Sequence, residues 1–157
     1  MTWQVTKTYG HHLGLSACFR QPHATSHCRD PHGYPLSFKL TFESHHLNSL
    51  NWVIDFGSLK WIKAWLEECF DHRTILAEDD PALGDFQELY SKWGFKEPLV
   101  IPFVGCEGFA KYVGDYIIRK LSDMAAAGEL QGGDNGVILK SVEVREHDAN
   151  SAIYICG

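Results

Sequence analysis

Residues Ser26 to Tyr34 bring together a thiol, two imidazoles, a guanidinium and a phenol within nine positions. Pro31 and Gly33 break regular structure, so the segment is expected to be a loop between two strands. Strands in a core rarely need this mixture of side chains, whereas loops on a rigid scaffold often carry binding and catalytic groups. The segment is therefore the first place to look for chemistry.

Cys28 is the candidate reactive group of this loop. The alternative is that it acts as a small buried hydrophobe, which is the ordinary role of a cysteine. Its neighbours His27 and Arg29 can carry positive charge, which favours the thiolate form over the thiol. Because the surrounding sequence is polar, we predict a functional role for Cys28.

Asp71 and His72 form a second candidate group, just after a predicted helix. A carboxylate beside an imidazole can hold the ring in one tautomer as a general acid or base. Asp71 could equally be a polar residue that ends the helix. The adjacent pair alone does not separate these two interpretations.

Glu146 continues the apolar face of a predicted strand on which Ile138, Lys140, Val142 and Val144 precede it. Such a carboxylate lies either at the solvated rim or inside a pocket. In a pocket it would suit a ligand with adjacent N–H donors, such as a guanidine-like edge. Glu107, at the start of a predicted helix, is most simply a first-turn charge that the helix dipole favours.

The histidines of the loop raise the question of a metal. A catalytic zinc site usually has three protein ligands, and His23, His27 and His32 are available. All three come from one segment, and no H-x-H pair lies on a strand. Spacing alone leaves a zinc site open.

The remaining pattern predicts the elements that must position these groups. Apolar residues alternate with polar ones over Leu36–Phe42, which indicates a strand with one buried face. Runs of strands and runs of helices are segregated along the chain, which favours an α+β fold with two helices on one face of an antiparallel sheet, in one domain over 1–157. The expected strands span about 3–19, with a bend, 36–42, 138–146 and 151–155, and the expected helices span 56–70, after an Asp55 cap, about 81–90, and 107–127.

Composition limits the partners. The net charge is −6 and no basic cluster exceeds two residues, which argues against nucleic acid. No apolar run approaches the roughly 20 residues that span a bilayer, and the N-terminus does not resemble a secretion signal. The five cysteines are widely spaced without a C-x-x-C pair, so we expect a cytoplasmic, reduced protein.

Four motifs, in order, resemble the 6-pyruvoyl-tetrahydropterin synthase family, which includes the bacterial 6-carboxytetrahydropterin synthases. The first is the Cys28-x-x-x-His32-Gly33-Tyr34 loop, similar to the family's C-x-x-x-H-G-H. The others are the strand-to-helix junction 52–60, the Phe70-Asp71-His72 segment, and the closing hairpin with Val144-Arg145-Glu146 and Ala152-Ile153-Tyr154. The resemblance spans about residues 15–155.

The resemblance implies a tunnelling fold: four antiparallel strands and two helices per subunit, with subunits joined into a barrel, typically a hexamer of two trimers. It implies a pterin substrate, dihydroneopterin triphosphate, from which triphosphate is eliminated with rearrangement or cleavage of the side chain. By resemblance, Cys28 is the general base and Asp71 with His72 is the proton relay. Glu146 would anchor the pterin ring, and Gly105, Cys106 and Glu107 would line its pocket.

The resemblance also implies a zinc ion held by three histidines, and here the sequence departs from the family. Phe19 stands where the first histidine is expected and Tyr34 where the third is expected, so only His32 keeps a ligand position. Phenylalanine cannot bind a metal, so we expect the usual site to be absent or severely weakened. His23 or His27 could substitute. We infer a variant subgroup that retains the thiol, relay and anchor.

Two functions follow from the resemblance. The first is a pterin synthase or lyase. Its expected product is 6-carboxytetrahydropterin, which feeds queuosine-type deazaguanine biosynthesis. The alternative is a non-catalytic pterin- or purine-binding homo-oligomer that has lost its zinc.

Overall fold

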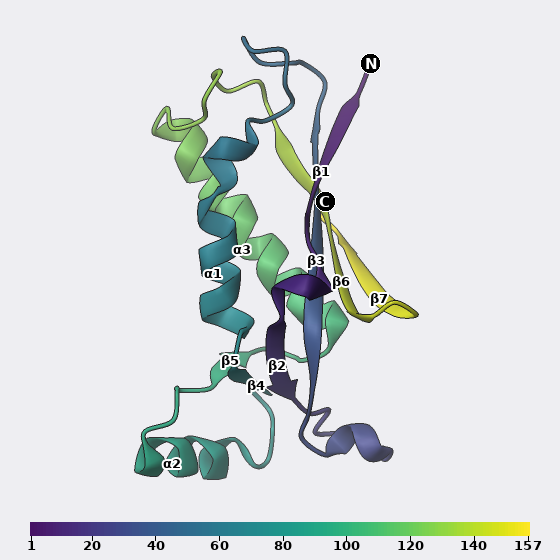
Figure 1. Cartoon of the computed structure of the whole chain (residues 1–157), viewed down its shortest axis with the longest axis vertical. Coiled ribbons are helices and arrows are strands. Elements are labelled where there is room, and N and C mark those ends of the chain that lie inside the picture. The colour runs from purple at the N-terminus through teal and green to yellow at the C-terminus, as the bar shows by residue number, and fades with distance from the viewer.

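The computed structural model describes residues 1–157 as seven strands and three α-helices, joined by turns and short 3₁₀ segments (Figure 1). The strands are β1 (Trp3–Tyr9), β2 (Leu15–Phe19), β3 (His32–Ser44), β4 (Arg73–Ala77), β5 (Leu99–Ile101), β6 (Ile138–His147) and β7 (Asn150–Ile155); the helices are α1 (Trp61–Phe70), α2 (Leu83–Trp93) and α3 (Cys106–Ala126). No helix has both the length and the apolar composition to cross a membrane.

Strand β3 is the centre of the sheet. Along one side it pairs with β2 and then β1, and along the other with β6, antiparallel in each case. Its alternate residues Leu36, Phe38, Leu40 and Phe42 are fully buried, which confirms the predicted periodicity. At thirteen residues β3 extends well beyond the predicted strand, and its first residues reach the candidate loop.

The expected bent strand over 3–19 is two strands. The 3₁₀ turn His11–Leu13 and Gly14, whose φ is +65°, separate β1 from β2. Tyr9 nevertheless lies opposite Phe38, and Leu15 lies opposite Leu36. The two strands therefore continue along the same edge of β3, and the break lies outside the ladder.

Helices α1 and α3 lie side by side against one face of the sheet (Figure 1). Phe70 of α1 bridges the layers, with its ring centroid 4.9 Å from that of Phe38 and 5.6 Å from that of Phe109. A carboxylate oxygen of Asp55 accepts a hydrogen bond from Gly57 N at 3.0 Å, but the segment that it caps, Phe56–Leu59, is a 3₁₀ turn, and α1 begins only at Trp61 instead of at the predicted residue 56. The α+β class with two helices on one face is confirmed.

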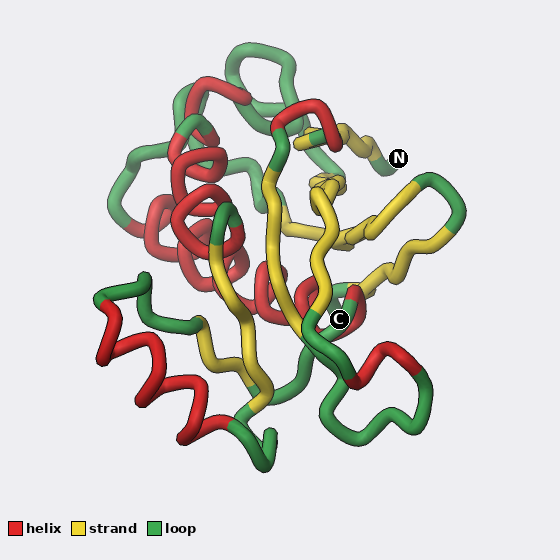
Figure 2. Tube along the Cα trace, turned by 60° about the horizontal axis from the view of Figure 1, so that its bottom comes forward, coloured by secondary structure: helices red, strands yellow, loops and turns green.

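The prediction of four strands was too low. β4 and β5 extend the sheet beyond β2 in the order β5-β4-β2-β3-β6-β7, and β2–β4 and β4–β5 are parallel pairs. β4 is short and nearly all buried, so it lacks the alternation by which a strand is recognised. The short helix expected near 81–90 is α2, which lies in the connection from β4 to β5, at the lower left of Figure 2.

The predicted face of β6 is correct only in its second half. Thr41 pairs with Ser141 and Phe42 with Leu139, so Lys140 is bulged out of the ladder. The bulge reverses the alternation, and Leu139 is buried whereas Ile138 is exposed. Val142 and Val144 are buried as predicted, which leads the strand correctly to Glu146.

Candidate active site

A cavity of about 180 Å³ lies where the beginnings of β3 and α3, the Cys28 loop and the β6–β7 hairpin meet. It contains seven of the residues singled out from the sequence, from positions 19 to 146. The residues that line it are Phe19, Gln21, Cys28, His32, Gly105, Cys106, Glu107, Glu146, Asn150 and Ser151.

The loop that carries Cys28 is held by hydrogen bonds at both ends. Gln21 N donates to Cys28 O at 2.8 Å, and Cys28 N donates to Ser26 Oγ at 3.4 Å. Arg20 at the end of β2 donates to Arg29 O at 3.1 Å. Cys28 is half-buried, so its thiol is both positioned by the loop and open to a ligand.

Glu146 reaches the cavity from a second β-bulge. Arg145 pairs with Ser151 and His147 with Asn150, which leaves Glu146 without a partner in the β6–β7 ladder. Bulges commonly re-aim a side chain beside a functional site. Asn150 Nδ2 donates to Glu146 Oε1 at 3.2 Å, which positions the carboxylate while each of its two oxygens keeps a lone pair for a ligand.

The start of α3 forms the wall next to Glu146. Gly105 has a φ of +103°, a conformation that favours glycine. Gln21 Nε2 donates to the neighbouring carbonyl oxygen of Val104 at 3.1 Å. Burial, together with the charges of Glu146 and Glu107, raises the pKa of Cys106 to about 11, so this thiol is neutral near pH 7 and cannot serve as a base there.

Asp71 and His72 do not line the cavity. A single carboxylate oxygen of Asp71 accepts from Ser16 N at 3.2 Å and lies 2.8 Å from His72 Nδ1, so the carboxylate contacts and orients the imidazole. Ser16 precedes Phe19 by three residues on β2, which is about 10 Å of strand. The His72 side chain is 85% exposed. Within the chain, Asp71 and His72 therefore lie outside the cavity that contains Cys28.

The backbone at His72 is unusual. Its φ is +53°, which is costly for a residue with a Cβ and is found most often where function requires it. His72 N donates to Ser16 O at 2.6 Å, and this bond holds the strained conformation against β2.

The three positions at which the resemblance implies zinc ligands converge on one spot. Phe19 pairs with His32 across β2 and β3, with ring centroids 4.8 Å apart. The Tyr34 ring lies 6.3 Å from Phe19 and 5.7 Å from His32. Only His32 can bind a metal well, and no three His, Cys, Asp or Glu side chains of the chain are grouped to hold an ion.

His23 and His27, the two possible substitute ligands, do not complete a three-ligand zinc site with His32. His23 pairs with Asp79 at 2.8 Å on the surface, and His27 is exposed. Neither lines the cavity. The residues present therefore do not fit the zinc site of the family.

Three residues that line the cavity were not predicted from the sequence: Gln21, Asn150 and Ser151. Asn150 could have been found, because a turn residue four positions after Glu146 in a hairpin returns beside it. Gln21 follows a strand end and carries no comparable signal.

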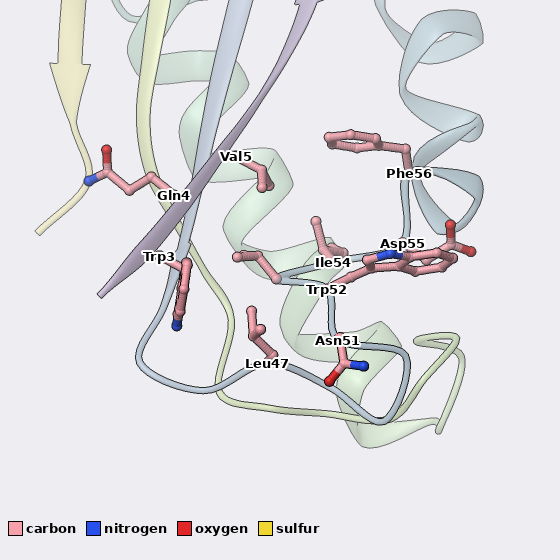
Figure 3. A pocket seen from close by; sticks show the side chains of 10 residues that line it. Trp3, Gln4, Val5, Leu47, Asn51, Trp52, Ile54, Asp55 and Phe56 are labelled. Carbon is pink, nitrogen blue, oxygen red and sulfur yellow. The ribbon is translucent and has the colours of Figure 1, made fainter. Parts of the chain in front are cut away.

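A larger hollow of about 340 Å³ lies at the opposite end of β3. Figure 3 shows Trp3, Trp52 and Phe56 around it. Its one titratable residue, Asp55, already caps the turn before α1. This hollow has no thiol or imidazole, whereas the smaller cavity contains the candidate groups Cys28 and His32.

The fold and site define a class: a small α+β protein with a mixed, mostly antiparallel sheet backed by two helices, and a cavity that combines a loop thiol with a carboxylate. The family model of 6-pyruvoyl tetrahydropterin synthase matches residues 10–155. The chain therefore belongs to this family, as the motifs predicted.

Individual relatives agree. The chain is 25% identical over 143 residues to the 6-carboxy-5,6,7,8-tetrahydropterin synthase of Aquifex aeolicus, covering 83% of this chain and 88% of that protein. It is 30% identical over 95 residues to the same enzyme of Rickettsia bellii, covering 60% and 67%.

Solved structures share the fold. An uncharacterized protein of Wolinella succinogenes superposes with a TM-score of 0.76 at 19% identity, covering 100% of this chain and 99% of that one. The 6-pyruvoyl tetrahydropterin synthase of Plasmodium falciparum superposes with a TM-score of 0.65 at 15% identity, covering 98% and 96%.

Proposed function

We propose that the protein is a pterin synthase of the lyase type that acts on dihydroneopterin triphosphate, eliminating triphosphate and rearranging or cleaving the side chain. The observation that carries the proposal is that Cys28 and Glu146, from opposite ends of the chain, line one cavity. The names of the relatives favour the 6-carboxytetrahydropterin reaction, whose product would enter queuosine-type deazaguanine biosynthesis.

The cavity suggests a role for each group. The carboxylate of Glu146 accepts hydrogen bonds from the 2-amino group and the adjacent ring N–H of the pterin, which are two parallel donors. Cys28 as thiolate removes a proton from a carbon of the side chain. Cys106, whose pKa is raised to about 11, stays a neutral wall residue, which leaves Cys28 as the cavity's thiol base.

Assembly belongs to the same proposal. The outer edges of β1 and β7 are unpaired within the chain, and Ile153 and Ile155 of β7 are 58% and 62% exposed. Pairing of such edges would build the barrel of a homohexamer of two trimers. A neighbouring subunit would then bring Asp71 and His72 to Cys28. Sedimentation as a monomer at micromolar concentration would contradict this assembly.

The activity is tested by incubating purified protein with dihydroneopterin triphosphate, with and without added zinc, and measuring triphosphate release. We expect turnover in the wild type and its loss in Cys28→Ala. Cys18→Ala is the matched control, because Cys18 is also half-buried but does not line the cavity. Absence of turnover in a folded wild type, with and without zinc, contradicts the proposal.

One observation favours a second function, a non-catalytic pterin- or purine-binding homo-oligomer. Phe19 and Tyr34 occupy the places of two metal ligands beside His32. This function predicts that a pterin binds in a Glu146-dependent manner while no reaction depends on Cys28. The same assay, combined with a binding measurement, separates the two. For either function we propose a reducing, cytoplasmic setting, supported by five cysteines without a disulfide.

A further inference from the structure

We propose that His32 contacts the substrate directly: its Nε2 accepts a hydrogen bond from a hydroxyl on the side chain of the pterin, in the place where relatives bind a metal. This inference rests on the proposed function and adds a specificity-determining residue to it. It starts from the position of His32, whose ring lines the same cavity as Cys28 and Glu146.

The hydrogen bonding of His32 fixes which nitrogen faces a ligand. His32 Nδ1 lies 2.7 Å from Asp30 O. A carbonyl oxygen can only accept, so Nδ1 carries the proton of this bond. In the neutral ring, Nε2 then has a free lone pair. A hydroxyl is the natural partner of such a nitrogen, because it can donate its proton.

The neighbouring rings restrain His32 and argue against the alternative that it binds a metal ion. Phe19 is 3% exposed and packs edge-on against Phe109, with centroids 5.0 Å apart. Tyr34 lies edge-on to His32. A metal at this spot would have one imidazole ligand instead of three, whereas a hydroxyl requires only one. The contacts with Phe19 and Tyr34 restrain the ring of His32.

Cys28 and Glu146 would orient the pterin relative to His32. Glu146 would hold the ring system of the pterin, and Cys28 would face the carbon chain attached to it. His32 follows Cys28 by four residues at the start of β3, whereas Glu146 comes from the β6–β7 hairpin, so in this proposal His32 meets the side chain of the ligand beside Cys28 and not the ring edge held by Glu146. His32 should therefore distinguish pterins that carry side-chain hydroxyls from those that do not.

The test uses two pterins in the presence of a chelator. Neopterin carries a trihydroxypropyl side chain, and 6-methylpterin carries no hydroxyl. Dissociation constants are measured by fluorescence for the wild type, His32→Ala, His32→Gln, Glu146→Gln and the control His27→Ala, which changes an exposed imidazole of the same loop. Circular dichroism checks that each variant is folded.

We expect His32→Ala to weaken neopterin binding about tenfold, the effect of one lost hydrogen bond, and to leave 6-methylpterin binding within about twofold. His32→Gln, which keeps an acceptor, should restore part of the neopterin affinity. Glu146→Gln should weaken both ligands, and His27→Ala neither. Equal losses for both pterins in His32→Ala, or no loss for either, would overturn the inference while leaving the proposed function intact. Failure of the wild type to bind either pterin overturns both.

A metal analysis tests the remaining alternative, that His32 is a zinc ligand. The double variant Phe19→His/Tyr34→His rebuilds three imidazoles at one spot and should gain zinc, measured by mass spectrometry after dialysis, that the wild type lacks. If the wild type instead retains stoichiometric zinc and loses it in His32→Ala, His32 is a metal ligand and the inference is wrong.

Discussion

The guanidinium of Arg20 binds the carboxylate of Asp80 at two points, with Nε 2.9 Å from Oδ2 and an Nη 2.8 Å from Oδ1. The carboxylate is fully buried and also accepts a hydrogen bond from Ala82 N at 2.8 Å. Because Arg20 donates to Arg29 O as well, the pair ties the loop of Cys28 to the turn after β4. A contact between residues sixty positions apart thus positions the candidate base.

Replacing Asp80 with Asn should destabilise the protein strongly. It leaves the largely buried Arg20 without its counter-charge, which typically costs about 3–5 kcal/mol. The matched control is Asp79→Asn, which breaks the exposed pair with His23 and should cost less than about 1 kcal/mol. Urea unfolding of both variants measures the difference, and equal losses would show that the Arg20–Asp80 pair does not hold the loop.

The same pair predicts how stability depends on acid. The hydrogen bonds from Arg20 lower the pKa of Asp80 below its ordinary value of 3.8. The stabilisation is therefore complete above about pH 4 and is lost as the pH falls through the lower pKa of the folded state. Unfolding free energies measured from pH 6 to pH 2 should fall more steeply in the wild type than in Asp80→Asn. Parallel curves would contradict the prediction.

Gly105 should tolerate no side chain. A Cβ there would lie 2.5 Å from Gln21 Nε2, in a backbone with a φ of +103°. Gly105→Ala should lower the unfolding free energy by about 1–3 kcal/mol and displace Gln21 from the cavity, which weakens binding of a pterin. Gly128→Ala is the control, since its φ is +68° but nothing lies within 4 Å. Calorimetry of the two variants, with a pterin titration, separates backbone strain from the clash.

The strained backbone of His72 gives a prediction about stability alone. His72→Ala keeps the Cβ that makes a φ of +53° costly, whereas His72→Gly removes it. His72→Gly should therefore be the more stable variant by about 1 kcal/mol, although both lose the imidazole and should lose turnover alike. Urea unfolding compares them, and a more stable alanine variant would show that the backbone at His72 is not strained.

The elements that sequence periodicity revealed are those with one buried and one exposed face. β3, α1 and α3 meet this condition, and their residues were predicted. β4 was missed because both of its faces are covered, and the face of β6 was half wrong because the bulge at Lys140 depends on the partner strand. Local sequence carries no record of either effect.

The residues of the candidate site likewise fall into those that the sequence predicted and those that it could not predict. Cys28, His32 and Glu146 were recognised by motif, and the structure brings them into one cavity. Gln21 and the tie between Arg20 and Asp80 could not be predicted, because they depend on how β2 and β4 pair. Asp71 and His72 illustrate a further limit: their mutual orientation is local, but the cavity of the single chain does not include them, so sequence and chain together leave their relation to Cys28 to the proposed assembly.

Glu146→Gln tests the anchor that the cavity proposes. Glutamine keeps the size of the side chain but replaces one acceptor oxygen with a donor, so it cannot accept two parallel N–H groups. Loss of a hydrogen-bonded charge of this kind costs about 1.5–3 kcal/mol, so a pterin should bind roughly 10- to 100-fold more weakly. Glu143→Gln is the control on the same strand, since Glu143 pairs with Arg145 at 2.7 Å outside the cavity. Isothermal titration measures both, and equal affinities in the two variants would place the anchor elsewhere.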